Sequence, residues 1–195
     1  MEPVTILAIS SSPRRGGNSE RLLDEAVKGA LTIGARVEKA ALCDYRIEPC
    51  RECRGCEGHG TCVVQDDYQL FYTKFLSCDR IVLATPVFFM GPSAQAKALI
   101  DRCQCFWERK YRMKQRIPDR PGVKRRGYLI ASAGSGLADS FDCCRKICTY
   151  FYRTLDMEYS GDCFANNLND GGEVERRPDA LKTAFDLGLL AANPL

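Results

Sequence analysis

Four cysteines lie within thirteen residues, at positions 50, 53, 56 and 62. Gaps of two residues separate the first three, and such spacing lets three thiolates converge on one face of a cubane. The segment therefore favours a 4Fe–4S cluster on Cys50, Cys53, Cys56 and Cys62. Zinc is the competing metal, because four thiolates suit it and His59 offers a fifth ligand. Zinc sites more often use two separated pairs of cysteines. A third interpretation is a loop that holds no metal.

A second group of polar residues spans positions 11–19, directly after an apolar run. The start of a helix attracts anions through its free backbone N–H groups. Donors at Ser12, Asn18 and Ser19 and the charge of Arg14 strengthen that attraction, and two glycines let the backbone approach a ligand. The segment matches neither GxGxxG nor GxxxxGK. It predicts a phosphate site, and the alternative is a tight glycine-rich turn.

Two further segments have a composition that suits a flat ligand. Pro86, Val87, Phe88 and Phe89 form an apolar run that could flank a ring, and the alternative is that they cover the edge of a sheet. The small residues Ser132, Ala133 and Gly134 allow close approach, and the alternative is a flexible turn.

The elements that must position these segments alternate along the chain. Strands are expected at 4–10, 36–42, 80–85, 127–132 and 157–163, and helices at 18–33, 66–77, 93–107, 139–155 and 179–192. This alternation predicts an α/β fold with a doubly wound five-stranded parallel sheet, in one domain over residues 1–195. A cysteine-rich loop is inserted at 43–64. Ligands of such sheets bind at the carboxyl ends of the strands, where all these segments should meet.

Composition narrows the chemistry. His59 is the one histidine, which excludes Ser-His and Cys-His nucleophiles elsewhere and leaves the chemistry to a cofactor. Twelve cysteines without a secretion signal predict a reduced, cytoplasmic protein. We expect no membrane span, since no apolar run approaches the ~18 residues it needs. We expect no nucleic-acid partner, since the net charge is only +3. The basic stretch 109–126 is interpreted as a solvated connection. Its alternative role is to attract an acidic redox partner or the 2′-phosphate of NADPH.

The other cysteines are expected to carry less chemistry. Cys43, Cys78 and Cys163 are predicted to be core residues, and Cys103 and Cys105 to point to different faces of one helix. Cys144 and Cys148 are predicted to be packed in the core.

The phosphate and ring segments resemble those of the flavodoxin-like NAD(P)H-dependent FMN reductase superfamily, and residues 94–102 resemble its helix after the ring loop. The compact cysteine spacing is similar to that of its iron–sulfur flavoprotein branch. The resemblance covers residues 4–135 and implies the strand order 2-1-3-4-5. It also implies that flavin N5 takes the hydride, so no catalytic side chain is expected. By the same resemblance, FMN phosphate would bind Ser12, Arg14, Asn18 and Ser19, and the ring would contact Pro86, Val87, Phe88, Phe89, Ser132, Ala133 and Gly134.

The resemblance further implies a homo-oligomer, either a dimer or a tetramer, with a ferredoxin-like protein or NAD(P)H as electron donor. Two alternatives stay open from the sequence. One is a cluster-free NAD(P)H-dependent FMN or quinone reductase. The other is a flavin-binding module whose cysteine loop senses zinc or redox state.

Overall fold

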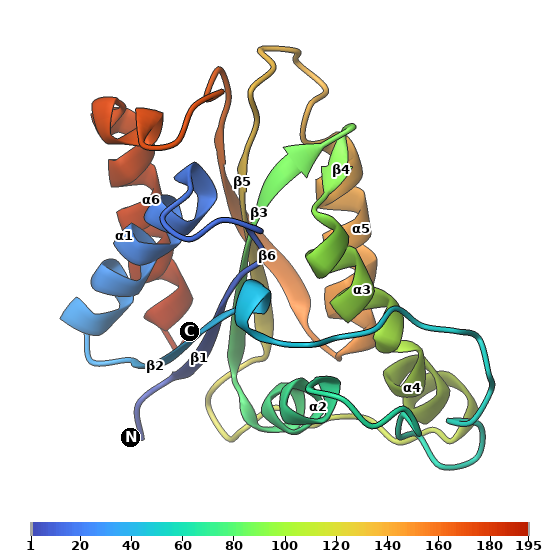
Figure 1. The fold of residues 1–195 in the computed structure, drawn as a ribbon. Helices are drawn as coiled ribbons and strands as arrows, with labels where there is room; N and C mark the ends of the chain where they lie inside the picture. Colours follow the sequence, from blue (N-terminus) through green and yellow to red (C-terminus); the bar gives the residue numbers. More distant parts are fainter. Residues whose placement is uncertain (1, 195) are drawn as a thin grey trace.

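The computed structural model describes residues 2–194 and has a parallel sheet between two layers of helices (Figure 1). The parallel strands lie in the order β2-β1-β3-β5-β6. This is the predicted order 2-1-3-4-5 when parallel strands alone are numbered, so the predicted fold class is confirmed. The strands are β1 (Thr5–Ser10), β2 (Arg36–Ala41), β3 (Arg80–Phe88), β5 (Arg126–Ser132) and β6 (Glu158–Ala165).

Helices cover both faces of this sheet. On one face lie α1 (Asn18–Thr32) and α6 (Pro178–Ala192), and on the other α2 (Tyr68–Ser77), α3 (Ala94–Arg102) and α5 (Asp142–Thr154) (Figure 1). Because successive side chains of a strand point to opposite faces, β1 contributes to two cores. Ile6 and Ala8 pack beneath α1 and α6, whereas Leu7 and Ile9 pack toward α2 and α5. Burial on both faces explains the nearly unbroken apolar run of this strand.

Helices α1 and α6 pack backbone against backbone. A Cβ atom added at Gly188 would lie 1.9 Å from the carbonyl oxygen of Ala26, and one added at Gly29 would lie 2.2 Å from that of Phe185. Neither position has space for a side chain. The C-terminal helix is thereby held against the helix that follows the predicted phosphate segment.

Several boundaries differ from the prediction. Strand β3 continues through residues 86–88, expected to be loop, and pairs with an antiparallel strand, β4 (Gly91–Pro92). The helix expected at 93–107 is divided at Cys103 into α3 and α4 (Gln104–Trp107), followed by a π-helical turn (Glu108–Arg112). The basic stretch is only partly a solvated connection. Arg125 is buried and donates to the carbonyl of Phe75, and Arg120 pairs with Asp79 at 2.8 Å.

Two predictions about cysteines are wrong. Cys43 is exposed, because β2 ends at Ala41 and a short 3-10 turn, Leu42–Asp44, carries the chain outward. Cys103 and Cys105 do not point to different faces, since both are buried and their sulfurs lie 3.6 and 3.2 Å from the Tyr68 hydroxyl. The break between α3 and α4 brings them together. Cys78, Cys144, Cys148 and Cys163 are buried, as predicted.

Over residues 2–194, every helix falls short of the length and apolar character that crossing a bilayer requires.

Candidate functional site

A cavity of about 220 Å³ lies at the carboxyl edge of the sheet. The loop after β1, the last residues of β3 and the residues at the end of β5 line it, at the strand ends where they were predicted to meet. Every residue predicted for the flavin site lines this cavity except Phe89 and Ala133. Residues that the prediction missed are Pro13, Gly17, Leu168 and Asn169. The last two follow β6, and their position after a fifth parallel strand was the signal that could have found them.

The start of α1 forms the polar end of this cavity. Gly17 is the N-cap residue and provides no side-chain cap, so the first N–H groups of the helix have no partner within it. The Ser19 hydroxyl oxygen is buried and has no hydrogen-bond partner among the described residues. A buried hydroxyl without a partner is costly. Its position beside helix N–H groups and the exposed Arg14 fits an anionic ligand.

Neighbouring residues hold this loop in place. The Ser12 hydroxyl accepts from Arg14 N–H at 3.1 Å and donates to Arg14 carbonyl oxygen at 2.7 Å. The Glu20 carboxylate accepts from Gly16 N–H at 2.7 Å and pairs with Lys39 at 3.0 Å. Burial opposes the ionisation of Glu20, but these hydrogen bonds outweigh it and lower its pKa. These contacts within the protein hold the loop in this shape.

Asn18 has a different role from the one predicted for its side chain. Its carboxamide donates to the carbonyl of Asp170 at 2.8 Å and accepts from Val174 N–H at 3.3 Å. These bonds tie the loop after β6 to the start of α1. The backbone N–H of Asn18 and the second N–H of its carboxamide are the donors left to bind an anion.

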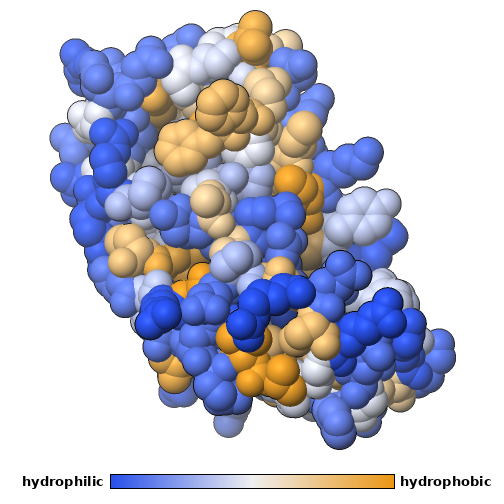
Figure 2. Space-filling view, turned by 45° about the vertical axis from the view of Figure 1, so that its right-hand side comes forward, coloured by the Kyte–Doolittle hydropathy of each residue, from blue (hydrophilic) through white to orange (hydrophobic). Residues whose placement is uncertain are grey.

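The hairpin between β3 and β4 forms the apolar side of the cavity. Phe88 pairs with Gly91, so Phe89 and Met90 form a two-residue turn, and their φ angles are 48° and 65°. Positive φ at both positions is the type I′ geometry, which favours Asn and Gly, and each left-handed residue here costs about 1 kcal/mol. Phe89 is fully exposed and Phe88 about half exposed. Figure 2 shows apolar side chains gathered on the upper part of the face that carries this hairpin.

A buried hydrogen-bond network joins the hairpin to the loop at positions 11–19. The Ser93 hydroxyl caps α3 by accepting from Ala96 N–H at 3.2 Å, and it donates to the Ser11 carbonyl at 2.7 Å. Ser93 N–H donates to the Thr85 hydroxyl at 3.0 Å. The two loops and the start of α3 are thus one rigid unit.

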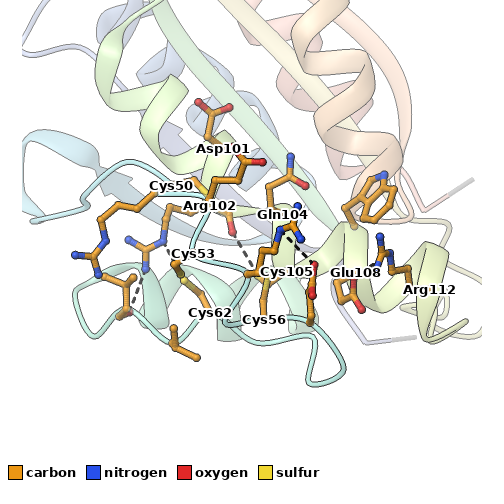
Figure 3. A pocket seen from close by; sticks show the side chains of 17 residues that line it. Cys50, Cys53, Cys56, Cys62, Asp101, Arg102, Gln104, Cys105, Glu108 and Arg112 are labelled. Carbon is orange, nitrogen blue, oxygen red and sulfur yellow. Dashed lines mark hydrogen bonds and ion pairs between the residues drawn. The ribbon is translucent and has the colours of Figure 1, made fainter.

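A second cavity, of about 460 Å³, is lined by all four cysteines of the predicted metal site and by Cys105 (Figure 3). Cys50 and Cys53 are exposed, while Cys56 and Cys62 are partly buried. Burial raises the pKa of the Cys56 thiol. Among residues 2–194, three or more metal-binding side chains do not converge tightly enough to form a metal site. The donor set fits a thiolate-ligated metal in composition, whereas the thiols stand apart in this conformation.

Contacts from the helices anchor the loop that carries these cysteines. The Tyr72 hydroxyl donates to Gly60 carbonyl at 2.9 Å, and Gly58 N–H donates to the buried Glu108 carboxylate at 3.1 Å. The Gln69 amide donates to the carbonyls of Cys62 and Val64, each at 2.9 Å. These anchors fix the second half of the loop. The exposed first half, with Cys50 and Cys53, has fewer such contacts.

Helix α3 connects the two cavities. It begins after Ser93 beside the hairpin, and its last residue, Arg102, lines the cysteine cavity. Nine helical residues span about 13 Å, since each adds 1.5 Å.

Comparisons with known proteins agree with this geometry. Residues 4–166 match the NADPH-dependent FMN reductase family. YwqN of Bacillus subtilis, whose name describes an NAD(P)H-dependent FMN-containing oxidoreductase, is 34% identical over 93% of this chain and 95% of its own. An iron–sulfur flavoprotein of Methanosarcina thermophila is 31% identical over 57% of this chain. This chain spans 59% of the length of that protein, and about half the length of two other iron–sulfur flavoproteins that it matches.

The fold has solved counterparts. An NAD(P)H:quinone oxidoreductase from Methanothermobacter marburgensis superimposes with a TM-score of 0.73 at 16% identity, over 96% of each chain. The superfamily predicted from the loop motifs is confirmed, and the iron–sulfur flavoproteins among the relatives agree with the predicted branch. On its loops, its strand order and these matches, the chain belongs to the NADPH-dependent FMN reductase family.

Proposed function

We propose that this protein is an FMN-dependent oxidoreductase that also holds an iron–sulfur cluster on Cys50, Cys53, Cys56 and Cys62. The observation that carries the FMN site is the buried, unpartnered Ser19 hydroxyl at the start of α1. It lines a cavity whose other walls supply an exposed arginine, an apolar hairpin and a small-residue loop. These walls suit the parts of FMN, because the arginine can pair with a phosphate, the apolar hairpin can cover a flat ring, and the small residues leave room for close approach. When bound, FMN accepts hydride at N5 and can exchange one or two electrons.

The residues of this chain have binding and orienting roles in the proposal. The Ser19 hydroxyl, the N–H of Asn18 and the Arg14 guanidinium hold the phosphate, and Ser12, whose hydroxyl bonds to the backbone of Arg14, shapes the loop around it. Pro86, Val87 and Phe88 flank the ring, and Ser132 and Gly134 lie near it, whereas Phe89 and Ala133 lie outside the cavity wall. No side-chain acid or base is assigned, which fits a chain whose single histidine, exposed His59, lies in the cysteine loop.

The cluster site is supported by the spacing of the four cysteines, by the cavity that all four line, and by the names of the relatives. NAD(P)H or a ferredoxin-like protein is the proposed electron donor. A homo-oligomer is also proposed, because it would cover the exposed hairpin tip. The twelve cysteines are unpaired, which suits a reducing cytoplasm.

One observation favours a second candidate, a cluster-free NAD(P)H-dependent reductase. Cys50 and Cys53 are exposed, and the four thiols do not converge as they stand. Zinc in the same loop is the third outcome. A cluster or zinc would draw the thiols together, so iron, sulfide and zinc content separates the three outcomes.

The test is a visible spectrum of protein purified without oxygen, with iron, sulfide and zinc assays. Flavin bands with a broad shoulder at longer wavelength, together with iron and sulfide, support the proposal. Flavin with neither iron nor zinc supports the cluster-free reductase. A colourless protein that contains zinc would overturn both redox functions.

A further inference from the structure

The arginine at the end of α3 lies in the wall of the cysteine cavity. The Arg102 side chain is only 1% exposed. Its guanidinium group lies over the Tyr68 ring, with 4.6 Å between its central carbon and the ring centroid. A buried arginine is rare unless its charge is paired. Its carboxylate partner is Asp66, which is also buried.

All five N–H groups of this guanidinium make hydrogen bonds. Nη1 donates to Glu48 carbonyl at 2.9 Å and Nη2 to Val64 carbonyl at 3.1 Å. Asp66 accepts from both nitrogens, at 2.6 and 3.1 Å. The remaining donor, Nε–H, reaches the Cys62 sulfur at 3.2 Å. Figure 3 shows Arg102 directed from α3 toward the loop that carries the cysteines.

These partners lie at the two ends of the cysteine segment. Glu48 precedes Cys50 by two residues, and Val64 follows Cys62 by two. Asp66 also joins the two ends of the segment, because its carboxylate accepts a hydrogen bond from Glu48 N–H at 2.9 Å. Arg102 therefore bridges the entry and the exit of the loop, and it contacts one of the four sulfurs directly.

We propose that Arg102 is the positioning residue of the cysteine loop. It closes the loop before metal binds, and its Nε–H bond and positive charge at Cys62 raise the reduction potential of the cluster. The second part rests on the proposed function, since it requires a cluster on these cysteines. Hydrogen bonds to ligand sulfurs and local charge are known determinants of iron–sulfur potentials, because both stabilise the more negative, reduced state.

Two substitutions separate closure from charge. Arg102→Lys keeps the positive charge but loses the planar five-donor fork, whereas Arg102→Gln loses both. Arg112→Gln is the matched control. Arg112 lines the same cavity, but its side chain is 60% exposed and pairs with Glu108 instead of a sulfur. Its charge is more strongly screened by solvent.

The experiment has two readouts. In metal-free protein, hydrogen exchange is measured at the amides of residues 48–64. We expect exchange to be at least about tenfold faster in both Arg102 variants, because each loses the buried fork that bridges the loop ends, and unchanged in Arg112→Gln. After anaerobic reconstitution with iron and sulfide, the midpoint potential is measured by redox titration. We expect it to fall most in Arg102→Gln, less in Arg102→Lys and least in Arg112→Gln.

The outcomes separate this inference from the function on which it rests. If wild-type protein assembles no cluster, the proposed function fails and the effect on potential fails with it. If wild type assembles a cluster and Arg102→Gln has the same potential, the inference alone is overturned. If neither Arg102 variant assembles a cluster, exchange decides. Faster exchange confined to residues 48–64 supports loop closure, and exchange equal to wild type overturns it.

Discussion

Replacing Ser19 with alanine tests the phosphate site through two effects of opposite sign. In the cofactor-free chain, the Ser19 hydroxyl is buried without a partner. Such a group costs about 1–3 kcal/mol, and alanine removes that cost and favours the helix. We therefore expect Ser19→Ala to raise the free energy of unfolding by about 1 kcal/mol, or the Tm by about 2–4 °C for a chain of this length.

The same substitution should weaken FMN binding. A hydrogen bond to a charged group contributes about 1.5–3 kcal/mol, which corresponds to about a ten- to hundredfold rise in Kd. At an FMN concentration well above the wild-type Kd, this loss of binding free energy exceeds the gain in unfolding free energy that the variant shows without FMN. The order of stabilities should then reverse, with wild type melting above the variant.

The assay combines a fluorescence titration of FMN with thermal unfolding, with and without FMN. Ser10→Ala is the matched control, because the Ser10 hydroxyl is also buried without a partner in the described chain but does not line the cavity. It should stabilise the free protein and leave the FMN Kd within about twofold of wild type. If Ser19→Ala binds FMN as tightly as wild type, Ser19 does not contact the phosphate and our placement of the ligand is wrong.

Three other predictions concern the metal loop, the hairpin and the sheet. Cys53→Ser should lose iron and keep FMN, whereas Cys43→Ser, an exposed cysteine outside the cavity, should keep both by iron assay and flavin absorbance. Equal loss of FMN in Cys53→Ser would contradict separate sites. Met90→Gly should raise the free energy of unfolding in urea by about 1 kcal/mol, because glycine accepts the positive φ without cost. A decrease would show that the Met90 side chain contributes more than the turn costs. Burial opposes the ionisation of Asp79, but bonds from Arg120 and Thr5 lower its pKa below the ordinary 3.8. Ionised Asp79 thus adds stability above pH 4 that is lost as the pH falls through its lowered pKa. Denaturant titrations at pH 6 and pH 3 should therefore show a smaller loss of unfolding free energy in Asp79→Asn than in wild type. A loss as large as that of wild type would show that other carboxylates cause it.

Local patterns were sufficient to predict the sheet and the loops around the first cavity. Apolar runs covered on both faces mark parallel strands, and the residues that follow such runs must lie at one edge. Phe88 and Ser132 were found in this way. Leu168 and Asn169 were missed although a strand was predicted just before them, at 157–163, because the residues after that strand form no recognisable ligand-binding motif.

Contacts between distant residues were beyond the reach of the sequence. The partners of the Asn18 carboxamide are more than 150 positions away, so nothing near it indicated that its side chain was already in use. Arg102 lies inside the helix predicted at 93–107, and nothing in its sequence neighbourhood indicated that its side chain would be buried. Its five hydrogen bonds reach four residues that lie 36 to 54 positions earlier. The approach of Cys103 and Cys105 to Tyr68 depends on a helix break that periodicity did not reveal.

The length of α3 has an evolutionary consequence. Ser93 is locked to the phosphate loop and Arg102 to both ends of the cysteine loop, nine residues later. One residue inserted between them would rotate the guanidinium by about 100° and shift it by about 1.5 Å, away from all its partners. Among descendants of one ancestral sequence, insertions between Ser93 and Arg102 should therefore be purged.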